Sequence, residues 1–534
     1  MAAINTAKLK IFGTYSLLAL TVLLPLLLPG HILTLDMVFA PSIPIPDHVT
    51  SSYLFRVLLH VLDLVLPSEL IEKIMLYTIL AVSGYGMHQL ILYLKLNRPV
   101  STTYLAGFFY AINPYTYSRF MAGQYSVLLG YALLPLVCRA LLRLLAKPTA
   151  RQALQFSGWV VLVSIVSIHT LGLVGVLLIT GTSLTVWRLK QDKHKLTRLA
   201  KALGLASLVF GIASCYWVVP LLSGEGATAQ TIQGFGQGDR AAFATAGNNM
   251  LVQAVNSIRL QGFWAEGREL FLLPQDTVPA WGLLAIGVGI FVFVGGRALW
   301  RSQHRFIVGL FGLSALTGLV LAVGLIQLPG YREPHKFVGL IALMYAICMS
   351  QGVAHVLRKY KDTKVQVITA CCFVLLVAFT APMFWGFSGQ LRPRHYPADW
   401  FTINQVLNQD HDKFQTLFLP WHLYMHFGFA GRIVANPAPD FFDKPILVSN
   451  DPEFAGASRT TDDPIVKQLN DQVLPQAAKR TDLGAELAHQ RVKYIIFAKE
   501  SDAPDYDYLN HQYDLELVQE TDTLKLYRNK AWKD

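Results

Sequence analysis

The chain has 534 residues, of which 53% are hydrophobic and only 15% are charged, and its formal net charge is +11. This composition is typical of a polytopic membrane protein and excludes a soluble basic protein. Residues from 388 onward hold 16 Lys and Arg against 21 Asp and Glu, so the whole basic excess belongs to the apolar part before them. In the apolar part, the basic residues orient the chain in the membrane and contact anionic lipid. The positive charge therefore does not indicate nucleic-acid binding.

Eleven apolar segments are predicted to cross the membrane, because a hydrocarbon core about 30 Å thick requires roughly twenty helical residues. The third, fifth and sixth segments are short. The fold class expected for residues 1–388 is therefore an α-helical polytopic membrane domain with about eleven transmembrane helices. The predicted limits are 11–30, 71–93, 101–115, 124–142, 155–169, 170–187, 202–222, 279–296, 306–328, 337–357 and 365–388.

Basic residues gather in every second loop, and the rule that positive loops stay inside makes these loops cytoplasmic. The uncharged run 155–187 is flanked by basic loops on both sides, so it must cross an even number of times, with a turn near 169–172. One long tilted helix is the alternative, and it would reverse every later loop. The N-terminus is then inside and everything after 388 outside. The basic clusters are 8–10, 95–98, 139–151, 188–201, 297–305 and 358–364.

The first predicted outer region, 31–70, contains Asp36 close to the membrane edge and then a proline-rich stretch that ends at Asp47 and His48. Prolines at this density exclude a helix and keep the chain extended. Residues 54–66 follow as an amphipathic helix. It has charged and polar side chains on one face, as expected for a helix that lies in the membrane interface.

Two further outer regions interrupt the predicted spans. Region 223–278 is rich in glycine and polar residues, and a loop of this length is usually either functional or disordered, so a lid and an unstructured connection both stay open. Region 329–336 is short and contains four ionisable groups in five residues: Arg332, Glu333, His335 and Lys336. Such a density of charge at a membrane boundary is costly without a function.

The tail, 389–534, has the mixed pattern of a small α/β domain. Residues 414–419 and 492–498 are apolar runs typical of buried strands, and 515–518 with 523–527 predict a closing hairpin. The polar segment 436–465 is expected to form loops. The tail contains no nucleophile elbow, phosphate-binding glycine loop, HExxH motif or dinucleotide fingerprint.

The membrane half resembles the GT-C glycosyltransferases, and within them the group that includes the membrane arabinofuranosyltransferases. The resemblance rests on an aspartate just past the first span, an interfacial helix, many further spans and an outer C-terminal domain. It also rests on three short segments: Leu35-Asp36-Met37, Phe109-Tyr110-Ala111-Ile112-Asn113-Pro114 and Arg332-Glu333-Pro334-His335-Lys336-Phe337. It implies transfer of a sugar, with inversion, from a polyprenyl-phosphate donor to an envelope glycan or lipid on the outer face of a prokaryotic-type cytoplasmic membrane.

Transfer to an acceptor hydroxyl with a phosphate leaving group requires a base for the hydroxyl proton and cations for the phosphate. Asp36 is predicted to be the base, because a carboxylate near a low-dielectric boundary has its pKa raised toward the working pH. Arg332, His335 and Lys336 are predicted to bind the phosphate. The alternatives are a helix-end cap for Asp36 and a membrane-edge anchor for the 332–336 segment, with Arg332 paired to Glu333.

Five other residues complete the set of predicted substrate-binding residues: Glu333, Arg119, His169, Asp47 and His48. For Arg119 and the histidines, ordinary interfacial positions are the alternative. A site formed by Asp36, Asp47 and His48 would suit a divalent cation, the one cofactor considered. The second carboxylate that many GT-C enzymes have in the next outer loop is absent from 115–124.

Two other functions stay open at this point. A transporter of lipid or glycan is disfavoured, because the spans contain almost no ionisable residues and no inverted repeat is evident. A non-catalytic GT-C-like scaffold that binds envelope glycan is supported by the absent second carboxylate.

Overall fold

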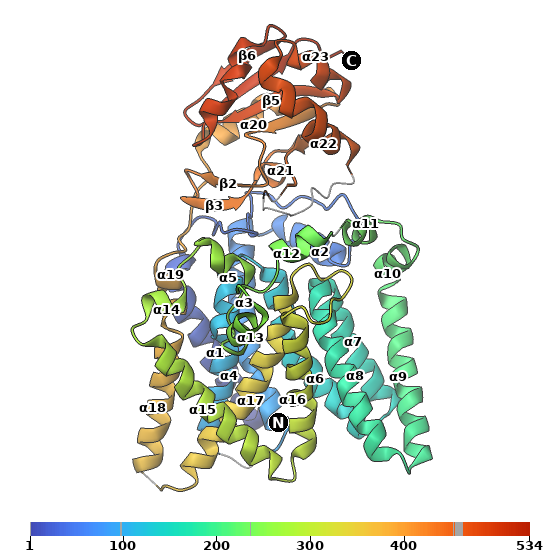
Figure 1. Cartoon of the computed structure of the whole chain (residues 1–534), viewed down its shortest axis with the longest axis vertical. Coiled ribbons are helices and arrows are strands. Elements are labelled where there is room, and N and C mark those ends of the chain that lie inside the picture. The colour runs from blue at the N-terminus through green and yellow to red at the C-terminus, as the bar shows by residue number, and fades with distance from the viewer. Residues whose placement is uncertain are drawn as a thin grey trace.

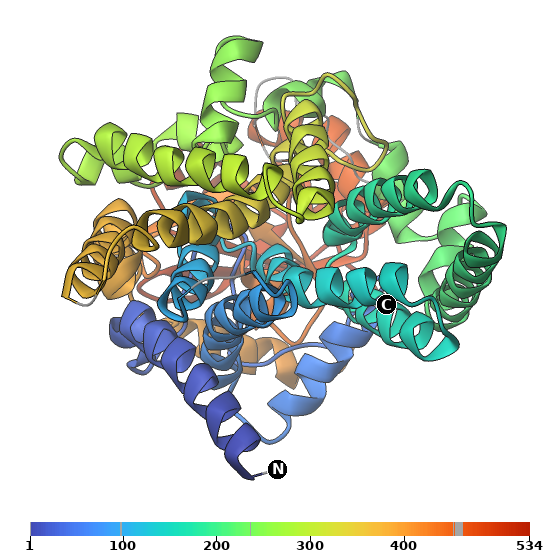
Figure 2. The same cartoon turned by 90° about the horizontal axis from the view of Figure 1, so that it is seen from below.

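The computed structural model describes residues 2–96, 99–234, 236–361, 363–451, 453 and 463–533. It shows a tall molecule in which a bundle of long helices has a smaller sheet domain stacked on one end (Figure 1). The C-terminus lies in the sheet domain and the N-terminal helix belongs to the bundle. Seen end-on, α1 and α9 lie at the rim of the bundle (Figure 2), whereas α17 is mostly buried.

Within the described residues, eight helical segments are long and apolar enough to cross a membrane, or nine if α18 (Thr363–Phe379) is taken together with the bent segment Ala381–Ser388 that follows it. The chain is therefore a helical polytopic membrane protein. The long helices are α1 (Ala2–Leu23), α3 (Ser68–Tyr93), α6 (Tyr125–Ala146), α8 (Ile168–Leu189), α9 (Lys193–Ala213), α15 (Trp281–Trp300), α16 (Arg305–Ala322) and α17 (Val338–Leu357).

Each of the eleven predicted spans contains a helix, but α4 (Ser101–Ala111) and α7 (Ala150–Val166) are too short to pass the same test. The count of eleven crossings therefore stays a prediction. The uncharged run 155–187 does break in two, because α7 ends at Val166 and α8 begins at Ile168. The break at Ser167 lies slightly before the predicted turn, and it excludes one long tilted helix.

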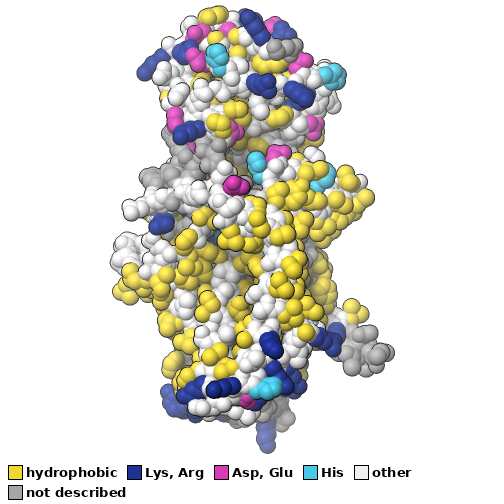
Figure 3. All heavy atoms as spheres, turned by 90° about the vertical axis from the view of Figure 1, so that its right-hand side faces the viewer, with side chains coloured by type: hydrophobic (Ala, Val, Ile, Leu, Met, Phe, Trp, Pro, Cys, Tyr) yellow, Lys and Arg dark blue, Asp and Glu magenta, His cyan; other side chains and the backbone are white. Residues whose placement is uncertain are grey.

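Charge is distributed along the molecule as the loop pattern predicts. On the face shown in Figure 3, the surface of the bundle is largely apolar, and Lys and Arg gather at the end of the bundle away from the sheet domain. Arg98, which belongs to one of these basic clusters, lies outside the described residues.

The amphipathic helix predicted at 54–66 is confirmed as α2 (Tyr53–Asp63), which lies across the end of the bundle next to the sheet domain (Figure 1). Its position in the membrane interface stays a prediction. Its polar face is not simply solvated. The Asp63 carboxylate accepts a hydrogen bond from the Ile43 backbone N–H at 2.8 Å, and the His60 ring lies 2.6 Å from the Ile43 carbonyl. The helix thus holds the proline-rich loop in place.

Region 223–278 differs from both sequence expectations. It folds into short helices at the end of the bundle next to the sheet domain, so it is neither an unstructured connection nor an isolated lid. Glycine and polar residues obscured this in the sequence because each helix has only one or two turns, too few for a periodic pattern. The elements are α11 (Ala227–Gln233), α12 (Gln237–Ala242), α13 (Met250–Ile258), η2 (Trp264–Arg268) and α14 (Pro274–Thr277).

The tail contains a five-stranded sheet of order β4-β1-β5-β7-β6 and a two-stranded ribbon, β2-β3. Strands β4, β1 and β5 are parallel, and β7 and β6 continue the sheet antiparallel. The predicted strands are confirmed; β4 and the ribbon were missed because they are very short. The strands are β1 (Gln415–Leu419), β2 (Tyr424–Phe427), β3 (Arg432–Ala435), β4 (Ile446–Leu447), β5 (Val492–Ala498), β6 (Leu515–Glu520) and β7 (Leu524–Asn529).

Shorter helices complete the structure. In the bundle they are η1 (Leu24–Leu27), α5 (Pro114–Met121), α10 (Cys215–Leu222), η3 (Pro334–Phe337), η4 (Ala381–Met383) and α19 (Phe384–Ser388). In the tail they are α20 (Ala398–Gln409), α21 (Ala438–Phe441), α22 (Pro464–Gln468), η5 (Leu469–Val473), η6 (Leu474–Lys479), α23 (Leu483–His489) and η7 (Ala503–His511).

The loop after α1 joins the bundle to the tail through backbone hydrogen bonds. His31 and Arg394 exchange two of them, at 2.8 and 2.7 Å. The Ala435 N–H donates to the Leu35 carbonyl at 2.7 Å, so residues around Leu35 run parallel to β3. The tail is therefore fixed to the loop that contains Asp36.

Two glycines set the close approach of α15 and α17. A Cβ atom at Gly295 would lie 1.8 Å from the Cys348 carbonyl oxygen, and one at Gly352 would lie 1.9 Å from the Phe291 carbonyl oxygen. Only backbone hydrogens fit at these crossings, so the separation of the two helices depends on them.

We expect Gly295→Ala to destabilise the protein by about 1–3 kcal/mol, because the added methyl group forces the helices apart. Gly289→Ala on the same helix is the matched control, since a Cβ there meets nothing within 4 Å. Thermal unfolding in detergent micelles would compare the two variants. Equal unfolding temperatures of Gly295→Ala and Gly289→Ala would show that α15 and α17 are not closely packed at Gly295.

Candidate active site

The loop that contains Asp36 is held from two sides. At its beginning, side chains of the first turns of α3 bind its backbone: Glu72 accepts from the Ile32 N–H at 3.0 Å, and Lys73 donates to the Leu28 carbonyl at 2.5 Å. Further along, Thr34 and Met37 close a tight turn with two backbone hydrogen bonds, and Asp36 is in this turn. The charged start of α3 is therefore an anchor for the loop.

Gly123, in the connection between α5 and α6, allows the turn to approach. Its φ is +70°, and a Cβ atom there would lie 2.6 Å from the Met37 backbone nitrogen. The Asp36 N–H donates to the Ala122 carbonyl across this contact at 3.0 Å. A larger residue at 123 would both strain the backbone and push the turn away.

Two polar side chains bind the Asp36 carboxylate. The Tyr424 hydroxyl, on β2 of the tail, donates to Oδ1 at 2.7 Å, and the Gln124 amide donates to Oδ2 at 3.2 Å. Burial raises the pKa of Asp36, although the Tyr424 hydrogen bond opposes the rise, and the negative charge of Glu333 raises it further. The side chain stays partly exposed, so it has access to a substrate.

Glu333 is the second carboxylate of the site and is almost fully buried. Its Oε2 lies 2.7 Å from Arg119 Nη1 and 3.5 Å from Lys336 Nζ. Burial alone would raise the pKa of Glu333, but the charges of Lys336 and Arg119 outweigh burial and hold the pKa well below its usual range. The Gln124 amide also donates to Oε1 at 3.0 Å, so one amide group connects Glu333 with Asp36.

Arg119 is placed by the local sequence of α5. Asn113 caps this helix, its side chain accepting from the Thr116 N–H while the Thr116 hydroxyl accepts from the Asn113 N–H, and Pro114 occupies the first turn. This combination favours a helix start at that point. Two turns later Arg119 is fully buried, with its guanidinium over the Phe263 ring at 4.5 Å.

His335 is fully buried and has protein partners at both ring nitrogens. Nε2 lies 2.9 Å from the Gln261 carbonyl and therefore donates, and Nδ1 accepts from Arg119 Nη2 at 2.9 Å. This arrangement requires a neutral imidazole. It differs from the sequence expectation that His335 binds phosphate, because no ring nitrogen is left to do so.

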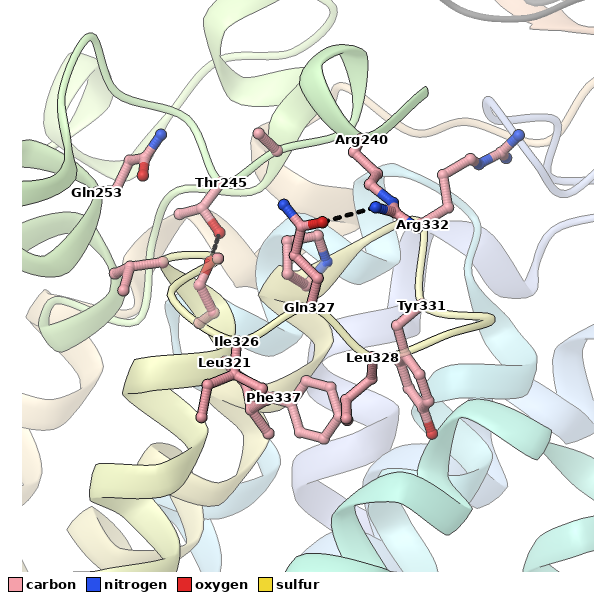
Figure 4. A pocket seen from close by; sticks show the side chains of 15 residues that line it. Arg240, Thr245, Gln253, Leu321, Ile326, Gln327, Leu328, Tyr331, Arg332 and Phe337 are labelled. Carbon is pink, nitrogen blue, oxygen red and sulfur yellow. Dashed lines mark hydrogen bonds between the residues drawn. The ribbon is translucent and has the colours of Figure 1, made fainter. Parts of the chain in front are cut away.

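Arg332 lines a cavity of about 190 Å³ between the α12–α13 connection and the segment after α16. Figure 4 shows it with Arg240, which donates to the Gln327 side chain at 2.7 Å. The Arg332 guanidinium lies 3.9 Å from the centre of the Phe243 ring. The ion pairs of Glu333 within the described residues are with Arg119 and Lys336, and the charge of Arg332 adds to their effect in lowering the pKa of Glu333.

The remaining predicted residues divide into two groups. His169 lies near the site, because its carbonyl accepts from the Tyr331 hydroxyl at 2.9 Å and its ring contacts the Tyr331 ring. Asp47 and His48 are exposed on the proline-rich loop. The described residues contain no group of three His, Cys, Asp or Glu side chains that could hold a metal ion, so the predicted set of Asp36, Asp47 and His48 is not assembled.

Three residues of the site were missing from the sequence prediction: Gln124, Tyr424 and Glu266. Burial raises the pKa of Glu266, which accepts from the Ser118 hydroxyl at 2.5 Å and from the Gly262 N–H at 2.6 Å. Gln124 and Tyr424 have no sequence signal, because an amide at a helix start and a tyrosine in a soluble domain are common. Glu266 could have been suspected as a carboxylate in an outer region.

No known family profile matches the sequence, and no curated protein is similar to it. Solved structures do match. The mycobacterial arabinofuranosyltransferase AftD has a TM-score of 0.66 and 14% identity over 97% of this chain. The oligosaccharyltransferase of Archaeoglobus fulgidus has a TM-score of 0.52 and 10% identity over 95% of this chain.

In fold, the chain is similar to GT-C membrane glycosyltransferases. The resemblance seen in the short sequence segments is thereby confirmed at the level of the fold. The chain spans 40% of the length of AftD and 71% of the length of the archaeal enzyme.

Removal of Arg119 is expected to destabilise the protein by about 3–5 kcal/mol, because Glu333 would lose a buried partner. Arg119→Met would be compared with Arg240→Met, which changes an exposed arginine, by thermal unfolding in micelles. A second substitution, Glu333→Gln, should recover part of the loss in the Arg119→Met background. If the effects of the two substitutions on thermal stability were additive, the Arg119–Glu333 pair would not contribute to the stability of the folded protein.

Proposed function

We propose that this protein is a membrane glycosyltransferase that transfers a sugar from a polyprenyl-phosphate-linked donor to an envelope glycan or lipid on the outer face of the membrane. The main support for the proposal is Asp36 and its surroundings. Asp36 is a partly exposed carboxylate with a raised pKa. It lies beside the buried cations Arg119 and Lys336, in a chain whose fold is similar to that of GT-C enzymes.

Asp36 acts as the general base in this proposal. As the acceptor hydroxyl attacks the anomeric carbon, its proton passes to the Asp36 carboxylate, and the bond between that carbon and the phosphate oxygen breaks with inversion. A raised pKa suits the role, since a base is most effective when its pKa is near the working pH. Glu333 is unsuited to it, because two cations hold its pKa low.

Lys336 and Arg332 are proposed to bind the leaving phosphate. Lys336 lies in the same cluster as Asp36 and Glu333, whereas Arg332 lines the neighbouring cavity together with Arg240. Guanidinium and ammonium groups stabilise the negative charge that develops as the donor bond breaks. The donor phosphate would thus lie on the 332–336 side of Asp36.

The acceptor is proposed to approach from the opposite side. Asp36 also lines a small cavity of about 80 Å³ with Phe39, Arg56, Tyr125 and Asp440. This cavity lies between the proline-rich loop, α2 and the tail, at the level where α2 lies on the bundle (Figure 1). A hydroxyl placed there would meet the carboxylate from the side away from Lys336.

The orientation follows from the charge pattern. We infer a cytoplasmic N-terminus, eleven crossings in residues 1–388 and an extracytoplasmic α/β domain at 389–534. The basic end of the bundle then faces the cytoplasm (Figure 3). AftD is an arabinofuranosyltransferase and the archaeal protein an oligosaccharyltransferase, so pentose and oligosaccharide donors are both reasonable first probes. A non-catalytic scaffold is the alternative.

Asp36→Asn should lower transfer of labelled sugar from polyprenyl-phosphate donors by roughly 10²–10⁴-fold, the usual contribution of a general base. Membranes containing each variant would be assayed with a panel of pentosyl and hexosyl donors. Asp276→Asn is the matched control, because Asp276 is an exposed carboxylate of another outer loop. Transfer that survives in Asp36→Asn would remove Asp36 as the base, and no transfer by the unaltered protein would favour the scaffold.

Tyr424→Phe is expected to shift the acid limb of the transfer rate to higher pH. The hydroxyl donates to the ionised carboxylate and so lowers the pKa of Asp36; without it, burial raises this pKa further. Asp36 must be ionised to accept a proton, so activity is lost as pH falls through its pKa. The measurement is kcat/KM against pH, with Tyr513→Phe, at an exposed tyrosine of the tail, as control. An unchanged limb would show that Tyr424 does not position or tune Asp36.

A further inference from the structure

A second cavity lies in the tail, outside the site described above. It has a volume of about 590 Å³, within the range of small-molecule sites. Aromatic rings and carboxylates dominate its lining, including Trp421, Tyr506, Tyr508, Asp502 and Asp505. Nothing in the proposed transfer step uses these residues.

The topology of the sheet explains why a cavity forms there. Strands β4, β1 and β5 are parallel, so their carboxyl ends meet at one edge. The chain passes from β1 to β4 on one side and then to β5 on the other side, which makes β1 a topological switch point. Loops that leave neighbouring strands in opposite directions open a crevice at that edge, where ligands bind in open α/β sheets. Trp421, Asp451 and Asp502 lie in the loops that follow β1, β4 and β5.

One polar atom in the cavity lining lacks a partner. The Asn470 side chain is only 6% exposed, and its Oδ1 accepts from Trp421 Nε1 at 2.6 Å. Its Nδ2 has no hydrogen-bond partner among the described residues. A buried donor without an acceptor is unfavourable, so an oxygen of a bound molecule would satisfy it.

The lining also defines the charge of the ligand. The His422 ring lies between the carboxylates of Glu453 and Asp502. These carboxylates raise the pKa of His422 to about 9, and the hydrogen bond to Glu453 is the largest cause. Among the described lining residues, the one imidazolium faces the carboxylates of Glu453, Asp502 and Asp505. This excess of carboxylates disfavours phosphates and uronic acids.

We propose that this cavity binds a sugar residue that carries no negative charge. Half-buried aromatic rings offer flat apolar faces for the C–H face of a sugar ring, and the carboxylates and the Asn470 amide match its hydroxyl groups. Only Leu423 separates His422, at the edge of the cavity, from Tyr424, so the Cα atoms of these two residues are about 7 Å apart. The Tyr424 side chain then extends to Asp36, to which its hydroxyl donates. If the proposed function holds, the bound sugar belongs to the acceptor glycan.

Binding is measured by calorimetry on the full-length protein in micelles, without any donor. The probes are a neutral arabino-oligosaccharide, a neutral manno-oligosaccharide, a chitosan oligomer and an oligogalacturonate. We expect a neutral or amino oligosaccharide to bind, and Trp421→Ala to weaken binding roughly tenfold by loss of the aromatic face. Asp505→Asn, at an exposed carboxylate, should weaken it less, and Tyr513→Ala, at an exposed tyrosine of the tail, should have no effect.

The two proposals fail separately in this design. Asp36→Asn should lose transfer but retain oligosaccharide binding. If the unaltered protein binds an oligosaccharide but transfers no sugar, the transferase is contradicted and the sugar site stands. Transfer by a protein that binds none of the four probes would overturn the sugar site alone. The sugar site would also be overturned if the oligogalacturonate bound best. The same holds if Trp421→Ala, Asp505→Asn and the unaltered protein bound the oligosaccharide with equal affinity.

Discussion

The buried ion pair between Arg119 and Glu333 is the interaction on which the rest of the site depends. A carboxylate excluded from water needs compensating charge, and Glu333 receives it from Arg119 and Lys336. The same arginine fixes the tautomer of His335, and Gln124 extends the network to Asp36. Segments separated by some two hundred residues are thereby held around one carboxylate.

The tail contacts the loop that contains Asp36 and so takes part in the candidate site. Its ribbon pairs with the loop around Leu35, and Tyr424 reaches across to Asp36. Two residues before Tyr424, the same segment forms the wall of the second cavity. The cavity in the sheet domain and the Asp36 carboxylate are therefore linked through the short segment that contains His422 and Tyr424.

Sequence reasoning found the residues whose chemistry is unusual for their surroundings. Asp36 and the 332–336 cluster were found because charges at a membrane boundary are costly, and the break near residue 167 was found because loop charges must alternate. The predicted cation site of Asp36, Asp47 and His48 is not assembled, because Asp47 and His48 are exposed on the proline-rich loop and do not gather around Asp36. Sequence reasoning also failed for Gln124 and Tyr424, because their residue types are common in those positions and only their partners distinguish them.

The sequence by itself determined the helical bundle, the α/β tail and the end of the bundle that contains the carboxylates. These properties depend on apolar length and on charge, which are summed along a short stretch of chain. The tertiary structure alone decided which cation neutralises Glu333, that His335 is occupied by protein partners, and that the tail touches Asp36. Such pairings join residues far apart in the chain, and no local pattern records them because they arise only when the bundle and the tail pack together.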